Sequence, residues 1–195
     1  VRLVGSEMCI RDSFHIPFQS GSNKILKAMN RGYTREKYLE LVAMIRRYVP
    51  EAAITTDIIV GFPGETEADF NDTLNLVKEV GFDAAFTFIY SKRSGTPAAA
   101  MEEQVPLDIK KARLNLLMEA QNISSLQRNE ALVGKTLEVL AEGPSNNNNK
   151  VWSGRTRTNK LVLWPVEGCD FELGDKVQVQ IETAQTWLLK GKAVE

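Results

Sequence analysis

The stretch Thr55-Thr56-Asp57-Ile58-Ile59-Val60-Gly61-Phe62-Pro63-Gly64-Glu65-Thr66 decides the fold of this chain. Its β-branched run, Ile58–Val60, predicts a short strand buried on both faces. Two glycines and a proline then predict a tight turn, and Thr66 with Asp69 three residues later predicts a capped helix start. Ligands of α/β folds bind at such strand-end loops. The stretch therefore predicts a ligand site, with an ordinary βα turn as the alternative.

Two further strands are expected beside this one, at Phe14–Phe18 and Ala84–Tyr90. Helical patterns separate the three strands, and connections of this length favour parallel pairing. The loops Gln19–Ser22, Gly61–Glu65 and Ser91–Thr96 should then share one face of the sheet. We expect residues 14–132 to form the C-terminal part of a (β/α) barrel, because a closed barrel normally needs about 250 residues.

The periodicity changes along the second half of the chain. Residues 107–132 are expected to form one long helix whose apolar face carries Ile109, Leu116, Leu117, Ala120 and Ile123. From Gly134 the apolar residues alternate with polar ones, which predicts short antiparallel strands closing into a small OB-like barrel over 133–195. The fold class is therefore α/β followed by a small all-β domain.

Residues 1–13 fit neither pattern. They are interpreted as a segment foreign to the natural protein, or as a terminus that is disordered or partly paired.

Composition restricts the function classes. The 195 residues are 43% hydrophobic and 25% charged, as in globular proteins, and the net charge of −1 gives no bulk attraction to nucleic acid. No apolar run reaches the roughly 20 residues of a membrane span. Cys9 and Cys169 suggest neither a disulfide framework nor a metal site, so a cytoplasmic protein is expected.

A local basic cluster lies in the second domain. Positive charges recur between positions 150 and 160 with one aromatic residue among them: Lys150, Trp152, Arg155, Arg157 and Lys160. Phosphate contacts combined with a stacking platform are typical of an RNA-binding surface. A solvated hairpin with a partly buried tryptophan is the alternative. The other two tryptophans, Trp164 and Trp187, are expected in the core.

Several motifs together resemble one family. The segments that carry the resemblance are His15–Ser22, Met29–Thr34, Asp57–Thr66 and Tyr90–Ala99, followed by Gly154–Lys160. The first four are similar to the methylthiotransferase branch of the radical S-adenosylmethionine (SAM) enzymes, and the chain from Gly134 resembles the TRAM module, an RNA-binding barrel. Arg93–Ala99 and Gly154–Thr156 look most like the tRNA branch.

The resemblance implies an enzyme that uses SAM and iron–sulfur clusters to add a methylthio group to isopentenyl-adenosine beside the tRNA anticodon. It also implies a three-cysteine motif, Cys-x-x-x-Cys-x-x-Cys, that this sequence does not contain. Thiolates hold such clusters. We therefore expect this chain alone to bind no cluster and to be inactive.

The family pattern also assigns roles to individual residues. By resemblance, the SAM-binding residues are Gln19, Ser20, Asp57, Ile59, Val60, Gly61 and Tyr90. Ile59–Gly61 would line the adenine, and Tyr90 would close the pocket. Asp57 would hold a polar group of SAM or make a hydrogen bond within the fold. His15 is expected to be structural. Arg93 would bind a substrate phosphate or the SAM carboxylate, or form a surface ion pair.

Two other functions stay open. A sibling branch modifies an aspartate of a ribosomal protein, and the chain could instead be a non-catalytic RNA-binding module. The expected partner is the tRNA anticodon stem-loop, bound by a monomer without any membrane association.

Overall fold

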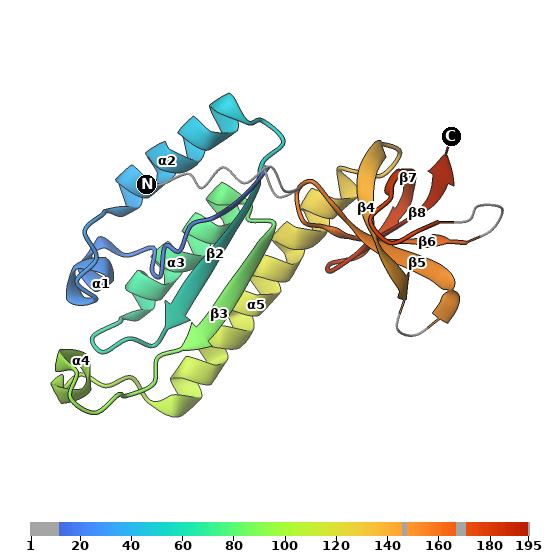
Figure 1. Ribbon diagram of the computed structural model, residues 1–195. Helices are drawn as coiled ribbons and strands as arrows, with labels where there is room; N and C mark the ends of the chain where they lie inside the picture. Colours follow the sequence, from blue (N-terminus) through green and yellow to red (C-terminus); the bar gives the residue numbers. More distant parts are fainter. Residues whose placement is uncertain (1–11, 146–147, 167–170, 195) are drawn as a thin grey trace. The chain divides into compact units, whose positions relative to one another are not determined.

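The computed structural model describes residues 12–145, 148–166 and 171–194 (Figure 1). These residues form two compact units. One contains Phe14–Pro50 and Ile54–Ser125, and the other contains the chain from Leu126 onward together with Glu51–Ala53. The interpretation of 1–13 as a foreign segment concerns residues that lie mostly outside the described ones. None of the described helices is long and apolar enough to cross a membrane.

The first unit is built on a three-stranded sheet. Its strands are β1 (Ser13–His15), β2 (Ala53–Val60) and β3 (Ala84–Ile89), in the order β1-β2-β3. β2 and β3 are parallel, with Thr55 opposite Ala84 and Val60 opposite Ile89. Past the end of β1, a parallel bridge joins Gln19 to Ile58. The predicted parallel sheet is therefore confirmed.

Three helices lie between the strands, and the one after Thr66 begins where the sequence predicts it. They are α1 (Asn23–Ala28), α2 (Arg35–Tyr48) and α3 (Glu67–Val80). The side chain of Thr66 accepts the backbone N–H of Asp69, and the Asp69 carboxylate accepts that of Thr66, which completes a capping box. α3 ends at Gly81 in the left-handed conformation, with φ 60°. The turn at Gly81 ends the helix shortly before β3 begins.

Side chains of β2 alternate between two environments. Ile54, Ile58 and Val60 are fully buried in the core beneath the helices. Thr55, Asp57 and Ile59 lie on the opposite face and are partly exposed. On the neighbouring strand, Phe86 and Phe88 share this open face and are 62% and 51% exposed. The sheet thus has one packed face and one accessible face.

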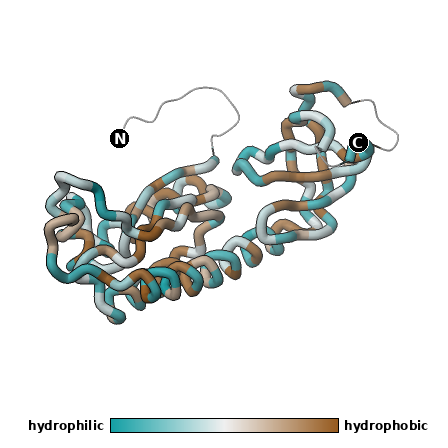
Figure 2. Tube along the Cα trace, turned by 90° about the horizontal axis from the view of Figure 1, so that it is seen from below, coloured by the Kyte–Doolittle hydropathy of each residue, from teal (hydrophilic) through white to brown (hydrophobic). Residues whose placement is uncertain are grey.

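The long helix α5 (Leu107–Glu130) packs differently from the prediction (Figure 1). Leu117 is fully buried as predicted, but Ile109, Leu116 and Ile123 are 40%, 50% and 54% exposed, so the predicted apolar face is wrong at these three residues. The buried face carries mainly polar residues: Lys110, Arg113, Leu117, Gln121, Ser124 and Ser125. The reason is that this face lies against backbone carbonyls that need hydrogen-bond donors. The carbonyl of Phe82, just before β3, accepts hydrogen bonds from the side chains of Gln121 and Ser124. Figure 2 shows hydrophilic and hydrophobic residues alternating along α5.

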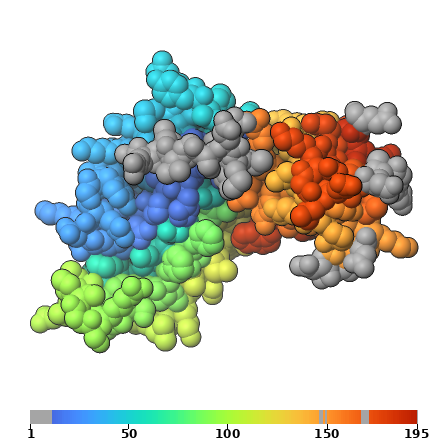
Figure 3. All heavy atoms as spheres, viewed as in Figure 1, coloured from blue at the N-terminus to red at the C-terminus, as the bar shows by residue number. Residues whose placement is uncertain are grey.

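A short helix, α4 (Pro97–Ala100), follows β3 and was not predicted. The residues leading into it, 91–96, are exposed, as the green region in Figure 3 shows. Pro97 supplies the fixed φ that suits a first helical turn.

The second unit is the predicted small barrel. Its strands are β4 (Thr136–Ser145), β5 (Asn148–Thr156), β6 (Leu161–Pro165), β7 (Lys176–Ala184) and β8 (Leu189–Val194). They close in the order β4-β5-β6-β8-β7. Trp164 is 1% exposed in the core, as expected. Trp187 is 64% exposed, so its assignment to the core is wrong. It sits in the β7–β8 turn, where alternation no longer determines which side a residue faces.

Candidate functional site

Residues from all three predicted strand-end loops line one hollow of about 980 Å³. Gln19 comes from the loop after β1, Asp57, Ile59 and Phe62 from β2 and its loop, and Tyr90 from the end of β3. The end of α1 and the segment from Ser91 to Ala98 complete the wall. The hollow belongs entirely to the first unit and is large enough for a nucleoside-sized ligand. The predicted convergence of the loops is confirmed.

The backbone around Gln19 joins two walls of this pocket. The Gln19 N–H donates to the Asp57 carbonyl at 2.9 Å, and the Ile59 N–H donates to the Gln19 carbonyl at 2.9 Å. Gln19 takes a φ of 67°, a left-handed conformation that is uncommon outside glycine. The two hydrogen bonds hold this strained residue against β2.

Asp57 and His15 are partners on the open face of the sheet. The Nε2 atom of His15 lies 3.4 Å from an Asp57 carboxylate oxygen, and Nδ1 lies 3.0 Å from the Thr55 hydroxyl. The His15 ring also packs edge-on against Phe86, at 6.0 Å between centroids. These contacts support the expectation that His15 is structural. The Asp57 side chain keeps 28% of its surface exposed, in the lining of the pocket.

The Gly61–Glu65 loop is held by a buried ion pair. The Glu65 carboxylate accepts the Gly61 N–H at 2.9 Å and pairs with an Arg113 Nη1 at 2.8 Å. The two side chains are 1% and 8% exposed. Burial raises the pKa of Glu65, opposed by the Gly61 amide and the Arg113 charge. Glu65 therefore holds the loop in place from inside the fold.

Lys110 of α5 joins this loop to the end of β3. Its ammonium donates to the Tyr90 carbonyl at 3.1 Å and lies 5.0 Å from the centroid of the Tyr90 ring. Its side chain covers Gly61, where a Cβ atom would lie 2.3 Å from the Lys110 Cγ. Burial lowers the pKa of Lys110, assisted by the Lys92 charge and opposed by that of Glu65. Sequence reasoning missed Lys110 and Arg113 because a lone cation on a helix usually faces solvent.

Three of the predicted cofactor-binding residues do not line the pocket. Val60 is fully buried on the helix side of β2, and its carbonyl accepts the Tyr90 N–H. Ser20 is 1% exposed, and its hydroxyl lies 3.5 Å from that of Thr73. Gly61 is buried, with its N–H directed to Glu65. These three residues shape the loops that carry Gln19, Ile59 and Tyr90.

The pocket lining combines apolar side chains with an unpaired polar group. Ile59, Phe62 and Phe88 offer apolar surface, and the ring of Phe62 lies edge-on to Tyr90 at 5.1 Å. The Tyr90 hydroxyl is buried and has no hydrogen-bond partner among the described residues. A polar ligand atom would satisfy it. Within residues 12–145, 148–166 and 171–194, no group of His, Cys, Asp or Glu side chains could hold a metal ion, so this part of the chain does not fit an iron–sulfur cluster.

Some cations of the predicted basic surface of the barrel already contact other side chains of the protein. Arg155 lies 3.6 Å from Glu142, and Arg157 lies 3.1 Å from Asp12. The Lys160 ammonium donates to the Asn129 side chain at 2.9 Å. Lys150 is exposed. Four cations thus follow β5 and the turn after it, as expected, but two of them have acidic partners from outside the 150–160 segment.

Trp152 lies partly in the barrel core. It packs edge-on against Phe171 at 5.9 Å between centroids and pairs across the sheet with Trp164. Only part of its surface is therefore open to a base.

Comparisons with known proteins identify both halves of the chain. The Radical SAM superfamily profile matches residues 7–77, and the TRAM domain profile matches residues 130–194. The chain combines a radical SAM segment with a TRAM domain. The residues of the radical SAM match include Gln19, Asp57 and Ile59 of the pocket lining, while the lining from Phe88 to Ala98 follows the match. The TRAM match covers the strands of the closed barrel. The family resemblance seen in the sequence is confirmed.

Curated relatives match nearly the whole chain. The tRNA-2-methylthio-N(6)-dimethylallyladenosine synthase of Moorella thermoacetica is 60% identical over 93% of this chain and 40% of its own length. The protein of the same name from Acetivibrio thermocellus is 52% identical over 94% of this chain and 38% of its own length. The chain therefore spans about 40% of the length of these relatives.

A solved structure of coproporphyrinogen III oxidase from Escherichia coli, a radical SAM enzyme, has a TM-score of 0.49 to this chain at 14% identity. The match covers 75% of this chain and 41% of that one.

Proposed function

We propose that this chain is part of an enzyme that adds a methylthio group to isopentenyl-adenosine beside the anticodon of tRNA. The supporting observation is the pocket, in which loops from three parallel strands converge, two of them within the residues of the radical SAM match. The relatives named for this product are 50–60% identical to the chain. Those names favour the tRNA branch over the ribosomal-protein branch.

The pocket residues would bind SAM, with Ile59 and the backbone at Gly61 along the adenine and Tyr90 closing the site. Asp57 would accept hydrogen bonds from the ribose or the methionine amine, because its carboxylate lies in the pocket wall. Gln19 and Ser20 would face the iron–sulfur cluster of the complete enzyme. Bound SAM would supply the radical chemistry, while these residues orient it and exclude water.

The TRAM domain would bind the anticodon stem-loop through Lys150, Arg155, Arg157 and Lys160, with Trp152 contributing its exposed edge. Arg93, at the pocket, would contact an RNA phosphate. The enzyme would act as a monomer in the cytoplasm, where tRNA is modified.

A segment exchange tests the proposed activity. Residues 14–194 replace the matching segment of the Moorella thermoacetica synthase, in a strain without its own synthase. Mass spectrometry of tRNA nucleosides should then show the 2-methylthio product. Unmodified isopentenyl-adenosine, despite a stable and folded chimaera, would contradict the proposal.

RNA binding is tested on the chain itself. Arg155→Ala with Arg157→Ala should weaken binding of an anticodon stem-loop and flatten its salt dependence. The reason is that a protein that contacts fewer phosphates releases fewer counterions when it binds. Lys190→Ala with Lys192→Ala removes the same charge from β8 and serves as the matched control. Equal binding by wild type and the arginine variant would discard this RNA surface.

A further inference from the structure

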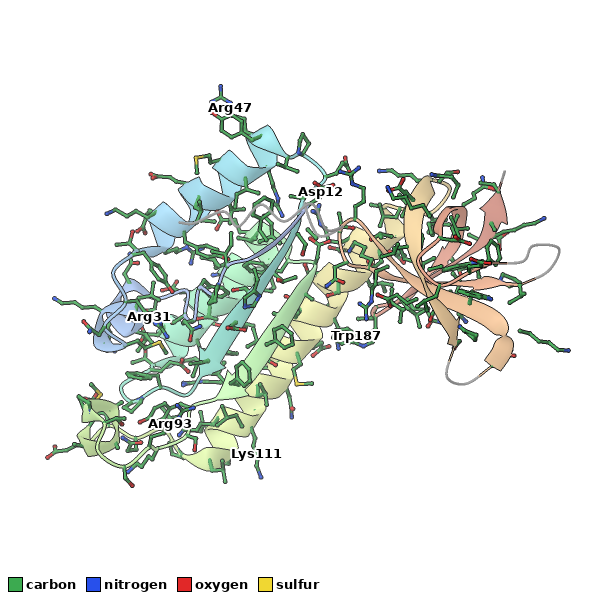
Figure 4. All side chains as sticks on the ribbon, in the orientation of Figure 1. Asp12, Arg31, Arg47, Arg93, Lys111 and Trp187 are labelled. Atoms are coloured by element: carbon green, nitrogen blue, oxygen red, sulfur yellow. The ribbon has the colours of Figure 1, made fainter. Side chains whose placement is uncertain are left out.

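Two arginines from different elements border the pocket of the radical SAM segment. Arg31 follows α1, and Arg93 lies between β3 and α4. Both side chains are exposed. Among the described residues, neither guanidinium has an ion pair or a hydrogen bond to the protein. Figure 4 shows both at the end of the sheet where β2 and β3 terminate, whereas Arg47 lies at the opposite end, on α2.

The backbone fixes the position of Arg31. α1 ends at Ala28, and Asn30 then turns the chain with a φ of 59°. The N–H groups of Asn30 and Arg31 donate to the last carbonyls of the helix, at 3.0 and 2.9 Å. This closed turn directs the chain toward the pocket, which Met29, Asn30 and Arg31 all line.

Tyr33 attaches the same segment to the loop after β1. Its hydroxyl lies 3.1 Å from the carbonyl oxygens of both Pro17 and Phe18. Burial raises the pKa of Tyr33, and the nearby Arg31 charge opposes this rise. Arg31 is therefore presented from a turn held at both ends, which reduces the entropy lost when it binds a ligand.

The charge of the pocket wall favours an anionic ligand. Arg31 and Arg93 are the cations of the lining, and Asp57, which His15 contacts, is its acid. A guanidinium presents a planar set of donors that matches an oxyanion with two hydrogen bonds. Both arginines line the same pocket and have no partner among the described residues, so their donors are available to an anion there.

We propose that Arg31 and Arg93 together clamp a backbone phosphate of the RNA, next to the nucleotide whose base enters the pocket. An enzyme that modifies a base must draw that nucleotide out of its stack, and phosphate contacts fix its register. This inference rests on the proposed tRNA substrate. The carboxylate of SAM shares the oxyanion chemistry, and the test separates it from the phosphate.

The test measures binding of an anticodon stem-loop containing isopentenyl-adenosine to the full chain, by fluorescence anisotropy at several salt concentrations. Arg31→Ala and Arg93→Ala should each weaken binding roughly five- to tenfold and lower the log–log salt slope by about 0.7 to 1. Arg31→Lys should recover the slope but only part of the affinity, because an ammonium lacks the planar fork. Arg47→Ala, an exposed arginine of α2, is the charge-matched control and should bind as wild type.

The same variants are titrated with S-adenosylhomocysteine, whose affinity should not change. Wild-type RNA binding by Arg31→Ala would overturn the clamp and leave the proposed function standing. Loss of S-adenosylhomocysteine binding with RNA binding intact would also overturn it, by assigning the arginines to the carboxylate. Failure of the wild-type chain to bind the RNA would contradict the proposed RNA substrate itself.

Discussion

The pocket loops of the radical SAM segment and the β5 surface of the TRAM domain hold their charged groups in opposite ways. In the pocket, Glu65 and Arg113 are buried and close a loop from inside the fold. On the barrel, Arg155 and Glu142 are 43% and 48% exposed. Buried pairs are costly to break, while exposed pairs contribute little. The loop beside the pocket is thus held by a pair that is costly to break, whereas the ion pairs of the barrel surface can be exchanged at little cost.

The largest expected effect is that of Arg113→Met. It leaves the Glu65 carboxyl buried without its cation, which should cost about 3 to 5 kcal/mol. Arg155→Met, at the exposed pair, should cost less than about 1 kcal/mol. Urea unfolding of the chain measures both. Glu65→Gln combined with Arg113→Met should recover part of the loss. Equal costs for the two arginines would remove the contrast between the regions.

Gly61→Ala should cost about 2 to 3 kcal/mol. Its φ of 72° disfavours a side chain, and its Cβ would meet the Lys110 stem. Gly32→Ala is the matched control, because nothing lies within 4 Å of its Cβ position. Its unfolding midpoint should stay near that of wild type. A wild-type midpoint for Gly61→Ala would show that Lys110 does not cover the loop.

The ionisation of Asp69 makes the stability of the first unit depend on pH. Burial works to raise its pKa, but hydrogen bonds from Ser22, Thr66 and Lys24 outweigh it and lower the pKa from its ordinary value of 3.8 to about 2. Because the folded value is the lower one, the stabilisation is complete above the unfolded pKa and is lost as pH falls toward 2.

The expected contribution of Asp69 at neutral pH is about 2 kcal/mol. Denaturant titrations of wild type and Asp69→Asn between pH 6 and pH 2 should converge at the acid end. Asp72→Asn, at an exposed position of the same helix, is the control. A constant difference between wild type and Asp69→Asn over this range would contradict the assignment.

The smallest expected effect is that of Trp187→Ala on the barrel. Because the side chain is 64% exposed, its loss should change stability by less than about 0.5 kcal/mol. Trp164→Ala, in the barrel core, should cost several times more. Thermal unfolding of the two variants measures both losses of stability. Similar losses would show that Trp187 is part of the core.

Local patterns in the sequence predicted most of the fold. The Thr66 capping box, the end of α3 at Gly81 and the alternation of β7 all depend on residues close in the chain. Such signals are visible without tertiary contacts. The convergence of the strand-end loops followed from parallel topology alone.

Long-range contacts account for what was missed. Arg113 pairs with Glu65 across 48 positions, and neither residue carries a local signal of burial. The polar buried face of α5 depends on carbonyls about 40 positions upstream, such as that of Phe82. Hydrophobic periodicity therefore identified Leu117 of the buried face but not its polar residues. The rim position of Arg31 likewise depends on Tyr33 contacting Pro17 and Phe18.

The central claim is that the three strand-end loops form one adenosyl-binding pocket. It is tested most directly by titrating the isotope-labelled chain with S-adenosylhomocysteine and following backbone amide shifts by NMR. Saturable shifts are expected at Gln19, Ile59 and Tyr90, with the strands of the TRAM domain unaffected. Shifts confined to the TRAM domain, or none at ligand concentrations of several millimolar, would contradict it.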